Sequence, residues 1–205
     1  MNNVGFDLWA DDYDKSVGLS DEEGVYPFAG YRDVLNKIYA GVLSRFGKVV
    51  LDIGFGTGTL TSKLYENGCE IYGQDFSDRM IELAYKKMPK AHLFQGDFSV
   101  GLADELTQNK YDSITATYSL HHLTDVQKID LLHLLLSLLK DDGCIYIGDV
   151  GFTTRKDMED CKIQMGNKWD DDEIYFIFDE VKITFPQIEF EQLSYCAGVF
   201  YLKNQ

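Results

Sequence analysis

The feature that most constrains this chain is a glycine-rich turn, DIGFGTG at 52–58, which begins at the end of a β-branched run over 48–53. Glycines at this spacing let the backbone turn tightly and let a ligand approach the start of the next helix. The segment 58–67, closed by Gly68, predicts that helix. A strand, a glycine turn and a helix in this order indicate a ligand site at the edge of an α/β sheet.

The rest of the chain alternates segments typical of strands and of helices. We predict strands over 69–75, 91–97, 111–120 and 144–150, helices from Ser77 to Met88 and from Thr124 or Asp125 to about Lys140, and a DDG turn at 141–143. Such alternation predicts a parallel sheet covered by helices on both faces. Residues 153–185 are predicted as helical pieces joined by a Gly-Asn turn at 166–167. After Pro186, IEFEQLSY and AGVFYLKN alternate as in an antiparallel hairpin at the sheet edge.

Acidic residues stand at the ends of the predicted strands, where an open α/β sheet binds its ligand. Asp75 ends the second strand 21 positions after Gly54, the place where a carboxylate binds ribose hydroxyls in such sheets. Asp97 ends the third strand, where Phe98 offers an aromatic face suited to adenine and Phe76 offers a second. Each acid alone is an ordinary loop residue, but together with the glycine turn they indicate a nucleoside site.

Two residues near the turn argue against a dinucleotide as the ligand. The dinucleotide fingerprint G-x-G-x-x-G requires glycine at position 59, which is Thr59 here. Asp52 stands two residues before the first glycine, where its carboxylate would repel a pyrophosphate and attract an ammonium group. A nicotinamide-dependent oxidoreductase is therefore the second choice among enzymes, and a purely structural turn is a further alternative.

The charge balance is strongly acidic. The 205 residues include 34 Asp and Glu against 19 Lys and Arg, for a formal net charge of −15. Nucleic acids and anionic membranes are bound through clustered Lys and Arg, so neither is an expected partner. Segments 1–23 and 157–180 carry 13 of the net negative charges. Either these segments favour a cationic or neutral ligand, or they form a solvated surface that promotes solubility.

The cysteines and the apolar segments predict a reduced, soluble protein. Four cysteines lie far apart, without the paired spacing of a zinc site or a redox motif, so no metal site is predicted. No basic region followed by an apolar run begins the sequence, and the apolar stretch 131–139 is too short to span a bilayer. We therefore expect a cytoplasmic protein that is a monomer or a homodimer.

The motifs DIGFGTG, GQDFS, QGDF and YSLHHLTD occur in this order between positions 52 and 125. They resemble class I S-adenosylmethionine-dependent methyltransferases over about 48–150. With FDLWADDYD and YPFAGY near the N-terminus, the chain is most similar to the small bacterial YrrT-type methyltransferases. The resemblance implies a Rossmann-like seven-stranded, mostly parallel sheet whose last strand is antiparallel.

The predicted domain organisation follows from these motifs and from the pattern of elements. We expect an N-terminal flap or lid over 1–30 and a single methyltransferase domain over 31–205. Within that domain, 48–150 is the cofactor half, and 153–205 holds the C-terminal helices and the hairpin.

The resemblance implies how the cofactor, S-adenosylmethionine, is held at its methionine end. Gly54, Gly56 and Gly58 would line its amino-acid and ribose portion, and Asp52 would lie near its ammonium group, directly or through water. Tyr118, just past the fourth strand, would contact the methionine portion.

The resemblance also implies the residues at the adenosine end. Asp75 would bind the ribose hydroxyls, and Asp97 would accept from the adenine amino group. Phe76 and Phe98 would pack against the adenine ring. The aromatic N-terminal segment either closes over the sulfonium or merely anchors itself on the sheet, and Tyr13 is its preferred ligand contact.

His121 and His122 follow the fourth strand at the carboxyl edge of the sheet, where ligands bind. Methyl transfer is an in-line displacement, and the acceptor must also lose a proton, so each histidine is a candidate for substrate contact or general base. The alternative is that they pack or cap the helix that begins near Asp125. The predicted acceptor is a small molecule, and a protein that binds the cofactor without using it is the alternative from another class.

Overall fold

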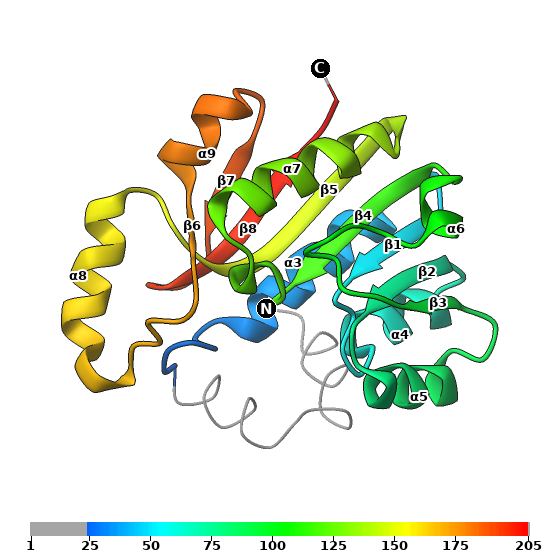
Figure 1. The fold of residues 1–205 in the computed structure, drawn as a ribbon, viewed down its shortest axis with the longest axis horizontal. Helices are drawn as coiled ribbons and strands as arrows, with labels where there is room; N and C mark the ends of the chain where they lie inside the picture. The colour runs from blue at the N-terminus through cyan, green and yellow to red at the C-terminus, as the bar shows by residue number, and fades with distance from the viewer. Residues whose placement is uncertain (1–23, 205) are drawn as a thin grey trace.

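A twisted sheet crosses the middle of the molecule and sets the position of every other element (Figure 1). The computed structural model describes residues 24–204. Seven strands lie in the order β3-β2-β1-β4-β5-β8-β7. They are β1 (Val49–Ile53), β2 (Glu70–Asp75), β3 (His92–Gln95), β4 (Tyr111–Thr117), β5 (Leu139–Phe152), β7 (Glu189–Gln192) and β8 (Ala197–Leu202). β1 to β5 are parallel and β8 is antiparallel to β5, which confirms the predicted Rossmann-like sheet.

Helices cover both faces of the sheet, as the alternation predicts. One face carries α3 (Tyr31–Leu43), α4 (Thr59–Glu66) and α5 (Asp78–Lys87), and the other carries α6 (Asp104–Thr107), α7 (Asp125–Ser137) and α9 (Phe178–Thr184). Figure 1 shows α7 in front of the sheet and α3 behind it. Neighbouring residues of β1 serve opposite faces: Val50 packs with Val34 and Leu64, whereas Leu51 packs with Leu132.

Side-chain caps fix the starts of two helices that border the carboxyl edge of the sheet. Ser77 accepts the N–H of Met80 at the start of α5, and Thr124 forms a reciprocal capping box with Gln127 at the start of α7. The predicted starts of these helices, at Ser77 and at Thr124 or Asp125, are confirmed. The caps satisfy N–H groups that would otherwise lack partners, and so they define where the preceding loops end.

The structure differs from the prediction around the DDG turn. Residues 141–143 belong to β5, which already begins at Leu139, and α7 ends at Ser137. Leu139 pairs with Tyr111 of β4, and the register shifts before Ser113 pairs with Cys144. Residues 140–143 have no partner in this register, so the Asp-Asp-Gly sequence forms an irregularity inside β5 rather than a turn that precedes it. Helix α3 and the short strand β6 (Phe176–Ile177), which pairs with the end of β5, were not predicted.

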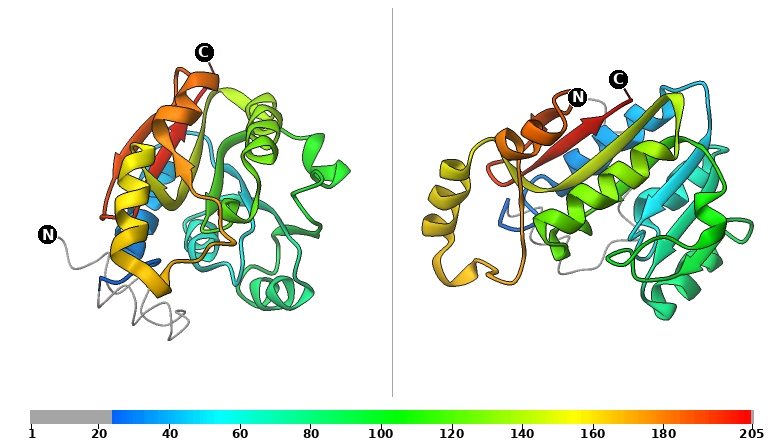
Figure 2. Two further views of the ribbon diagram at one scale, coloured as in Figure 1. Left: turned by 60° about the vertical axis from the view of Figure 1, so that its left-hand side comes forward. Right: turned by 45° about the horizontal axis from the view of Figure 1, so that its top comes forward.

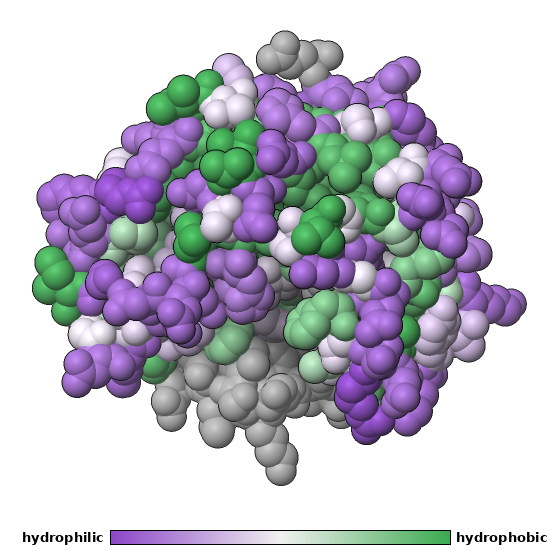
Figure 3. All heavy atoms as spheres, in the orientation of Figure 1, coloured by the Kyte–Doolittle hydropathy of each residue, from purple (hydrophilic) through white to green (hydrophobic). Residues whose placement is uncertain are grey.

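The segment after β5 leaves the sheet and then returns to it. Helix α8 (Arg155–Met165) lies at one end of the molecule, and the chain comes back through β6 to α9 (Figure 2). Cys161 is the one buried residue of α8, and the surface over this end of the molecule is mostly hydrophilic (Figure 3). The returning stretch 169–177 passes beside the carboxyl ends of β4 and β5. None of the described helices is long and apolar enough to cross a membrane.

Candidate active site

The turn between β1 and α4 is built from left-handed backbone. Gly54, Gly56 and Gly58 have φ angles of 69°, 56° and 75°, a region that residues with a Cβ rarely adopt. A Cβ on Gly54 would lie 2.5 Å from the Cβ of Ser119, whose hydroxyl donates to the Ile53 carbonyl at 2.9 Å. A Cβ on Gly56 would meet no atom of the described residues within 4 Å. The turn is therefore packed against the end of β4 on one side and open over Gly56.

Asp75 at the end of β2 holds this turn in place. The residue is 5% exposed, and its two carboxylate oxygens accept the N–H of Gly56 at 2.8 Å and the N–H of Ser77 at 2.9 Å. Each oxygen keeps a second lone pair, because one backbone N–H occupies only one. Asp75 thus has the capacity to accept two further hydrogen bonds.

A cavity of about 670 Å³ lies over the turn at the carboxyl edge of the sheet. It is lined by Gly54, Gly56, Asp75, Phe76, Ser77, Met80, Asp97, Phe98, Ser99, Tyr118, Ser119, His122 and Leu123. These residues follow β1, β2, β3 and β4. The strand order reverses between β1 and β4, and ligands bind at such a point in open α/β sheets.

Most of the residues predicted from the sequence meet at this cavity. Those in its lining are Gly54, Gly56, Asp75, Phe76, Asp97, Phe98, Tyr118 and His122. The lining does not include Gly58, Asp52 or His121. Gly58 is the N-cap of α4, and Tyr13 lies outside the described residues.

Asp52 lies beneath the turn. The residue is 1% exposed, and the Thr61 hydroxyl of α4 donates to its carboxylate. Burial raises the pKa of Asp52 to about 6, and Asp75 adds to that rise, although hydrogen bonds from Thr61 and Thr115 oppose it. A buried carboxylate with this pKa is stabilised in its charged form by any cation that approaches the turn.

Asp97, Phe76 and Phe98 surround the outer part of the cavity. Asp97 is exposed, and hydrogen bonds from the hydroxyl and the N–H of Ser99 lower the pKa of its carboxyl group. Phe76 is 71% exposed, whereas Phe98 is half-buried against the core on the α7 side. An anionic acceptor thus stands beside two aromatic rings at the rim.

Tyr118 directly follows β4 and has a left-handed conformation, with φ of 50°. Its ring lies 5.5 Å from that of Phe28 and 4.8 Å from that of Tyr31, measured between centroids. Tyr26 stacks on Trp169 at 5.3 Å and is 5% exposed. The YPFAGY motif therefore docks beside the cavity, between the turn after β4 and the loop before β6.

His121 and His122 occupy one 3-10 turn but have different surroundings. His121 is 7% exposed, its Nδ1 lies 2.7 Å from Oδ1 of Asp149 in β5, and its Nε2 lies 3.4 Å from Oε1 of Glu173. His122 is exposed and lines the cavity, and the two ring centroids are 4.3 Å apart. Only His122 of this pair faces the space where a ligand binds.

The two imidazoles also differ in their affinity for a proton. Burial disfavours a charge on His121, but Asp149 and Glu173 outweigh it and raise the pKa of this imidazole. Burial and the neighbouring His121 lower the pKa of His122. His122 is therefore neutral near pH 7, with a lone pair available on one ring nitrogen.

Sequence reasoning missed the partners of His121. Asp149 is fully buried within the apolar segment CIYIGDV, and a buried acid needs a partner, which is a signal that pointed to a histidine or a cation. Glu173 was not recognisable, because it lies within the acidic segment 157–180. Its proximity to His121 exists only in the folded chain.

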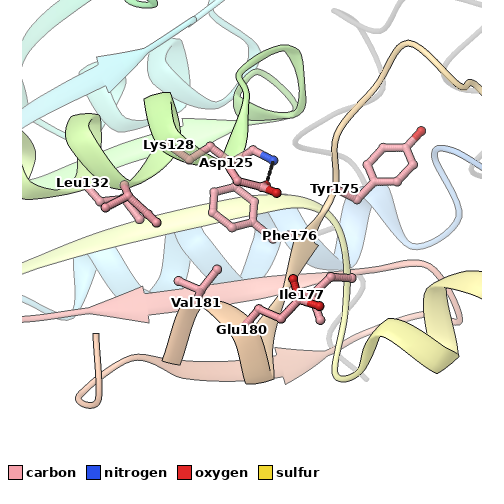
Figure 4. A pocket seen from close by; sticks show the side chains of 9 residues that line it. Asp125, Lys128, Leu132, Tyr175, Phe176, Ile177, Glu180 and Val181 are labelled. Atoms are coloured by element: carbon pink, nitrogen blue, oxygen red, sulfur yellow. Dashed lines mark ion pairs between the residues drawn. The ribbon is translucent and has the colours of Figure 1, made fainter. Parts of the chain in front are cut away.

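A second, smaller hollow of about 170 Å³ lies between α7, β6 and α9 (Figure 4). Lys128 is 2% exposed there, pairs with Asp125 at 3.5 Å and donates to the carbonyl of Ile174. Phe176 points toward Lys128 and Tyr175 points the opposite way (Figure 4). Lys128 therefore holds the returning segment against α7.

The Rossmann-like sheet, the glycine turn and the acid after β2 define a nucleoside-binding α/β protein. S-adenosylmethionine fits the residues present: the backbone is open over Gly56, Asp75 has lone pairs to offer, and aromatic rings stand at the rim. Three comparisons with known proteins bear on the choice of cofactor and on the reaction.

The chain matches the model of a methyltransferase domain over residues 50–143. An uncharacterized methyltransferase of Geobacillus sp. (strain WCH70) is 41% identical over 152 residues, which cover 74% of this chain and 68% of that protein. One of Alkaliphilus oremlandii (strain OhILAs) is 32% identical over 184 residues, or 89% and 81% of the two chains. The structure of magnesium protoporphyrin IX methyltransferase from Synechocystis PCC 6803 with bound SAH has a TM-score of 0.68 at 17% identity, covering 99% of this chain and 96% of that one.

The chain belongs to the class I S-adenosylmethionine-dependent methyltransferases. Its cofactor is S-adenosylmethionine, as the sequence predicts, and the nicotinamide-dependent oxidoreductase is no longer a candidate. The closer similarity to the YrrT-type proteins stays a prediction.

Proposed function

We propose that this protein transfers the methyl group of S-adenosylmethionine to a small-molecule acceptor by in-line displacement. The observation that carries the proposal is that one cavity joins the glycine turn and Asp75 to His122. Its volume of about 670 Å³ is typical of small-molecule sites. The net charge of −15 disfavours a nucleic-acid acceptor.

The cofactor roles proposed for the inner residues follow from their hydrogen-bonding capacity. The free lone pairs of Asp75 accept the ribose hydroxyls, and the glycine turn at Gly54 and Gly56, which is open over Gly56, accommodates the chain between ribose and methionine. Asp52, beneath the turn, stabilises the ammonium group through the field of its carboxylate or through water. Gly58 supports this arrangement by starting α4 in a left-handed conformation.

The remaining cofactor roles belong to the rim and the flap. Asp97 accepts from the adenine amino group, with Phe76 and Phe98 against the ring. Tyr118 contacts the methionine portion from the opposite end of the cavity. The segment 1–30 acts as a lid over the domain 31–205, with Tyr13 as its cofactor contact.

Bound S-adenosylmethionine supplies a methyl group on a positively charged sulfur. In the transfer, a bond forms between the acceptor atom and the methyl carbon while the carbon–sulfur bond breaks, and its electron pair stays on sulfur. The chain's contribution is to align the acceptor and to receive its proton. We assign contact with the acceptor to His122, and His121, fixed by Asp149, is its positioning residue.

The test uses a labelled methyl donor and an extract of small metabolites. We expect His122→Gln to lower labelled methyl transfer by more than tenfold while the affinity for S-adenosylhomocysteine, measured by calorimetry, changes less than twofold. His92→Gln is the matched control, because His92 lies exposed at the opposite end of the sheet, stacked on Tyr72. Failure of the wild type to bind S-adenosylhomocysteine would contradict the proposal, and binding without transfer to any acceptor would favour a non-catalytic binder.

A further inference from the structure

The histidine turn after β4 and the loop before β6 bring together a set of metal-ligating side chains. One nitrogen each of His121 and His122 and a carboxylate oxygen of Glu173 lie within 4.8 Å of one another. The prediction that the chain has no metal site rested on the spacing of its cysteines. A histidine and carboxylate set has no such spacing, because it is assembled by tertiary contact.

The hydrogen bond between His121 and Asp149 leaves one ring nitrogen of His121 able to bind a metal ion. Oδ1 of Asp149 lies 2.7 Å from Nδ1 and also accepts the N–H of Val150 at 2.8 Å, so the hydrogen of the neutral ring is on Nδ1. Nε2 then carries a lone pair and faces Oε1 of Glu173 at 3.4 Å. Two acceptor atoms that face each other need either a proton or a metal ion between them. A carboxylate behind the ligating histidine is also the usual outer partner in metal sites.

The outer contacts of Glu173 leave one donor atom in the same way. Its Oε2 accepts the hydroxyl of Tyr175 at 2.6 Å. The N–H of Ile174 donates to the carbonyl of His121 at 2.8 Å, while Lys128 donates to the carbonyl of Ile174. The backbone beside Glu173 is thus held from both sides, and Oε1 is directed at the histidines.

We propose that Nε2 of His121, Oε1 of Glu173 and a ring nitrogen of His122 bind a divalent first-row transition-metal ion, with zinc the best match. A proton would bridge Nε2 of His121 and Oε1 of Glu173 but would not involve the ring nitrogen of His122, whereas a metal ion would bind all three atoms. Two imidazoles and one carboxylate form the ligand set of open catalytic zinc sites, and they also suit iron, cobalt and nickel.

The position of the cluster gives the ion a role, and this role rests on the proposed function. His122 also lines the cofactor cavity, so an open coordination position lies at the acceptor end. The acceptor class is then a hydroxyl or a thiol, whose oxygen or sulfur binds the ion and whose pKa falls on binding. Its proton passes to water, its lone pair forms the bond to the methyl carbon, and the carbon–sulfur electron pair stays on the cofactor's sulfur. With an ion bound, the lone pair of His122 is used by the ion, so His122 contacts the acceptor through the ion, and water receives the proton in place of His122.

The test is a metal titration of the full chain without a polyhistidine tag, after removal of metal with a chelator. We expect one equivalent of Zn²⁺ by calorimetry, and visible absorption of bound Co²⁺ typical of a nitrogen-containing, low-coordinate site. Glu173→Gln should weaken Zn²⁺ binding by at least about tenfold. Asp172→Asn, which removes an exposed charge next to Glu173, should change it less than twofold and is the matched control.

Two outcomes would contradict the proposed metal site. In one, the wild type does not bind Zn²⁺ stoichiometrically; in the other, the wild type and Glu173→Gln bind Zn²⁺ with equal affinity. If Glu173→Gln does not fold, His122→Ala carries the same test, because this histidine is exposed. Calorimetry with S-adenosylhomocysteine on the same protein separates the two proposals: metal binding without cofactor binding contradicts the proposed function alone, and the reverse contradicts the metal site alone.

Discussion

The two ends of the proposed site, the cofactor end and the acceptor end, are built from different parts of the chain. The cofactor end is mostly backbone: three left-handed glycines and the N–H groups that Asp75 accepts, all within 54–77. The acceptor end is His122 in the cavity lining, supported from behind by side chains of separate segments that do not line the cavity, among them His121, Asp149, Glu173 and Tyr26. The first end is specified by a short stretch of sequence, and the second exists only after the chain has folded.

The cofactor end serves the binding of the ligand common to the class, whereas the acceptor end serves the individual protein. A backbone cradle tolerates few substitutions, because each left-handed position penalises a Cβ. Side chains on a returning segment can change without disturbing the sheet. We therefore expect changes at the cofactor end to abolish binding of the common ligand, and changes at the acceptor end to leave it intact.

The largest expected effect tests the cofactor end directly. Asp75→Ala removes a buried carboxylate that accepts two N–H groups of the turn and, in the proposal, two ribose hydroxyls. Charge-assisted hydrogen bonds contribute about 1.5–3 kcal/mol each, so the loss of two should raise the Kd for S-adenosylhomocysteine by at least about 100-fold. Calorimetry measures it, with Asp78→Ala, an exposed acid nearby, as the control. Unchanged affinity in a folded Asp75→Ala protein would contradict the ribose assignment.

A matched pair of glycines separates backbone strain from ligand contact. Gly56 and Gly68 both have positive φ angles, of 56° and 83°, and a Cβ on either would meet no atom within 4 Å in the described part of the chain. Alanine at each should cost about 1–2 kcal/mol of stability, seen as a lower Tm. Of the two variants, only Gly56→Ala should also weaken the binding of S-adenosylhomocysteine, by about tenfold, because of the two glycines only Gly56 lines the cavity. Equal affinities in the two variants would show that the turn does not hold the ligand.

Asp52 is a buried acid beneath the glycine turn at the cofactor end. Its pKa is about 6 in the folded protein and 3.8 in its ordinary state, so the folded state binds more protons between these values. The contribution of Asp52 to the free energy of unfolding therefore increases as the pH falls through 6. Relative to Asp52→Asn, the wild type should gain about 1 kcal/mol in the free energy of unfolding from pH 7 to pH 5. Denaturant melts at both pH values measure the gain, and a constant difference between the two proteins would contradict it.

The smallest expected effect is the sharpest test of the separation between the two ends. Glu173→Gln should leave the Kd for S-adenosylhomocysteine within twofold, because Glu173 does not line the cofactor cavity. Conversely, Asp75→Ala should leave Zn²⁺ affinity within twofold. Distant sites with no shared partners contribute independently. A Glu173→Gln variant that binds the nucleoside much more weakly would show that the two ends form one coupled unit.

The sequence predicts the sheet and the cofactor end well, since both depend on local pattern. Gly54, Gly56 and Asp75 are recognisable by spacing alone, and they meet at the cavity. The prediction fails where long-range pairing decides where an element begins, as at Leu139, which pairs with Tyr111 and so starts β5 ahead of the Asp-Asp-Gly sequence. It also could not find Glu173, because the contact with His121 joins residues that are far apart in the chain.

Trp169 offers an optical view of the acceptor end. It stacks on Tyr26 with an interplanar angle of 11° and lies 5.1 Å from Tyr175, between centroids. The chain has two tryptophans, and the other is Trp9. A Trp9→Phe protein would hold a single indole at the junction between the YPFAGY motif and the segment that carries Glu173. Its emission would report movement of that junction without any added dye, even before an acceptor has been identified.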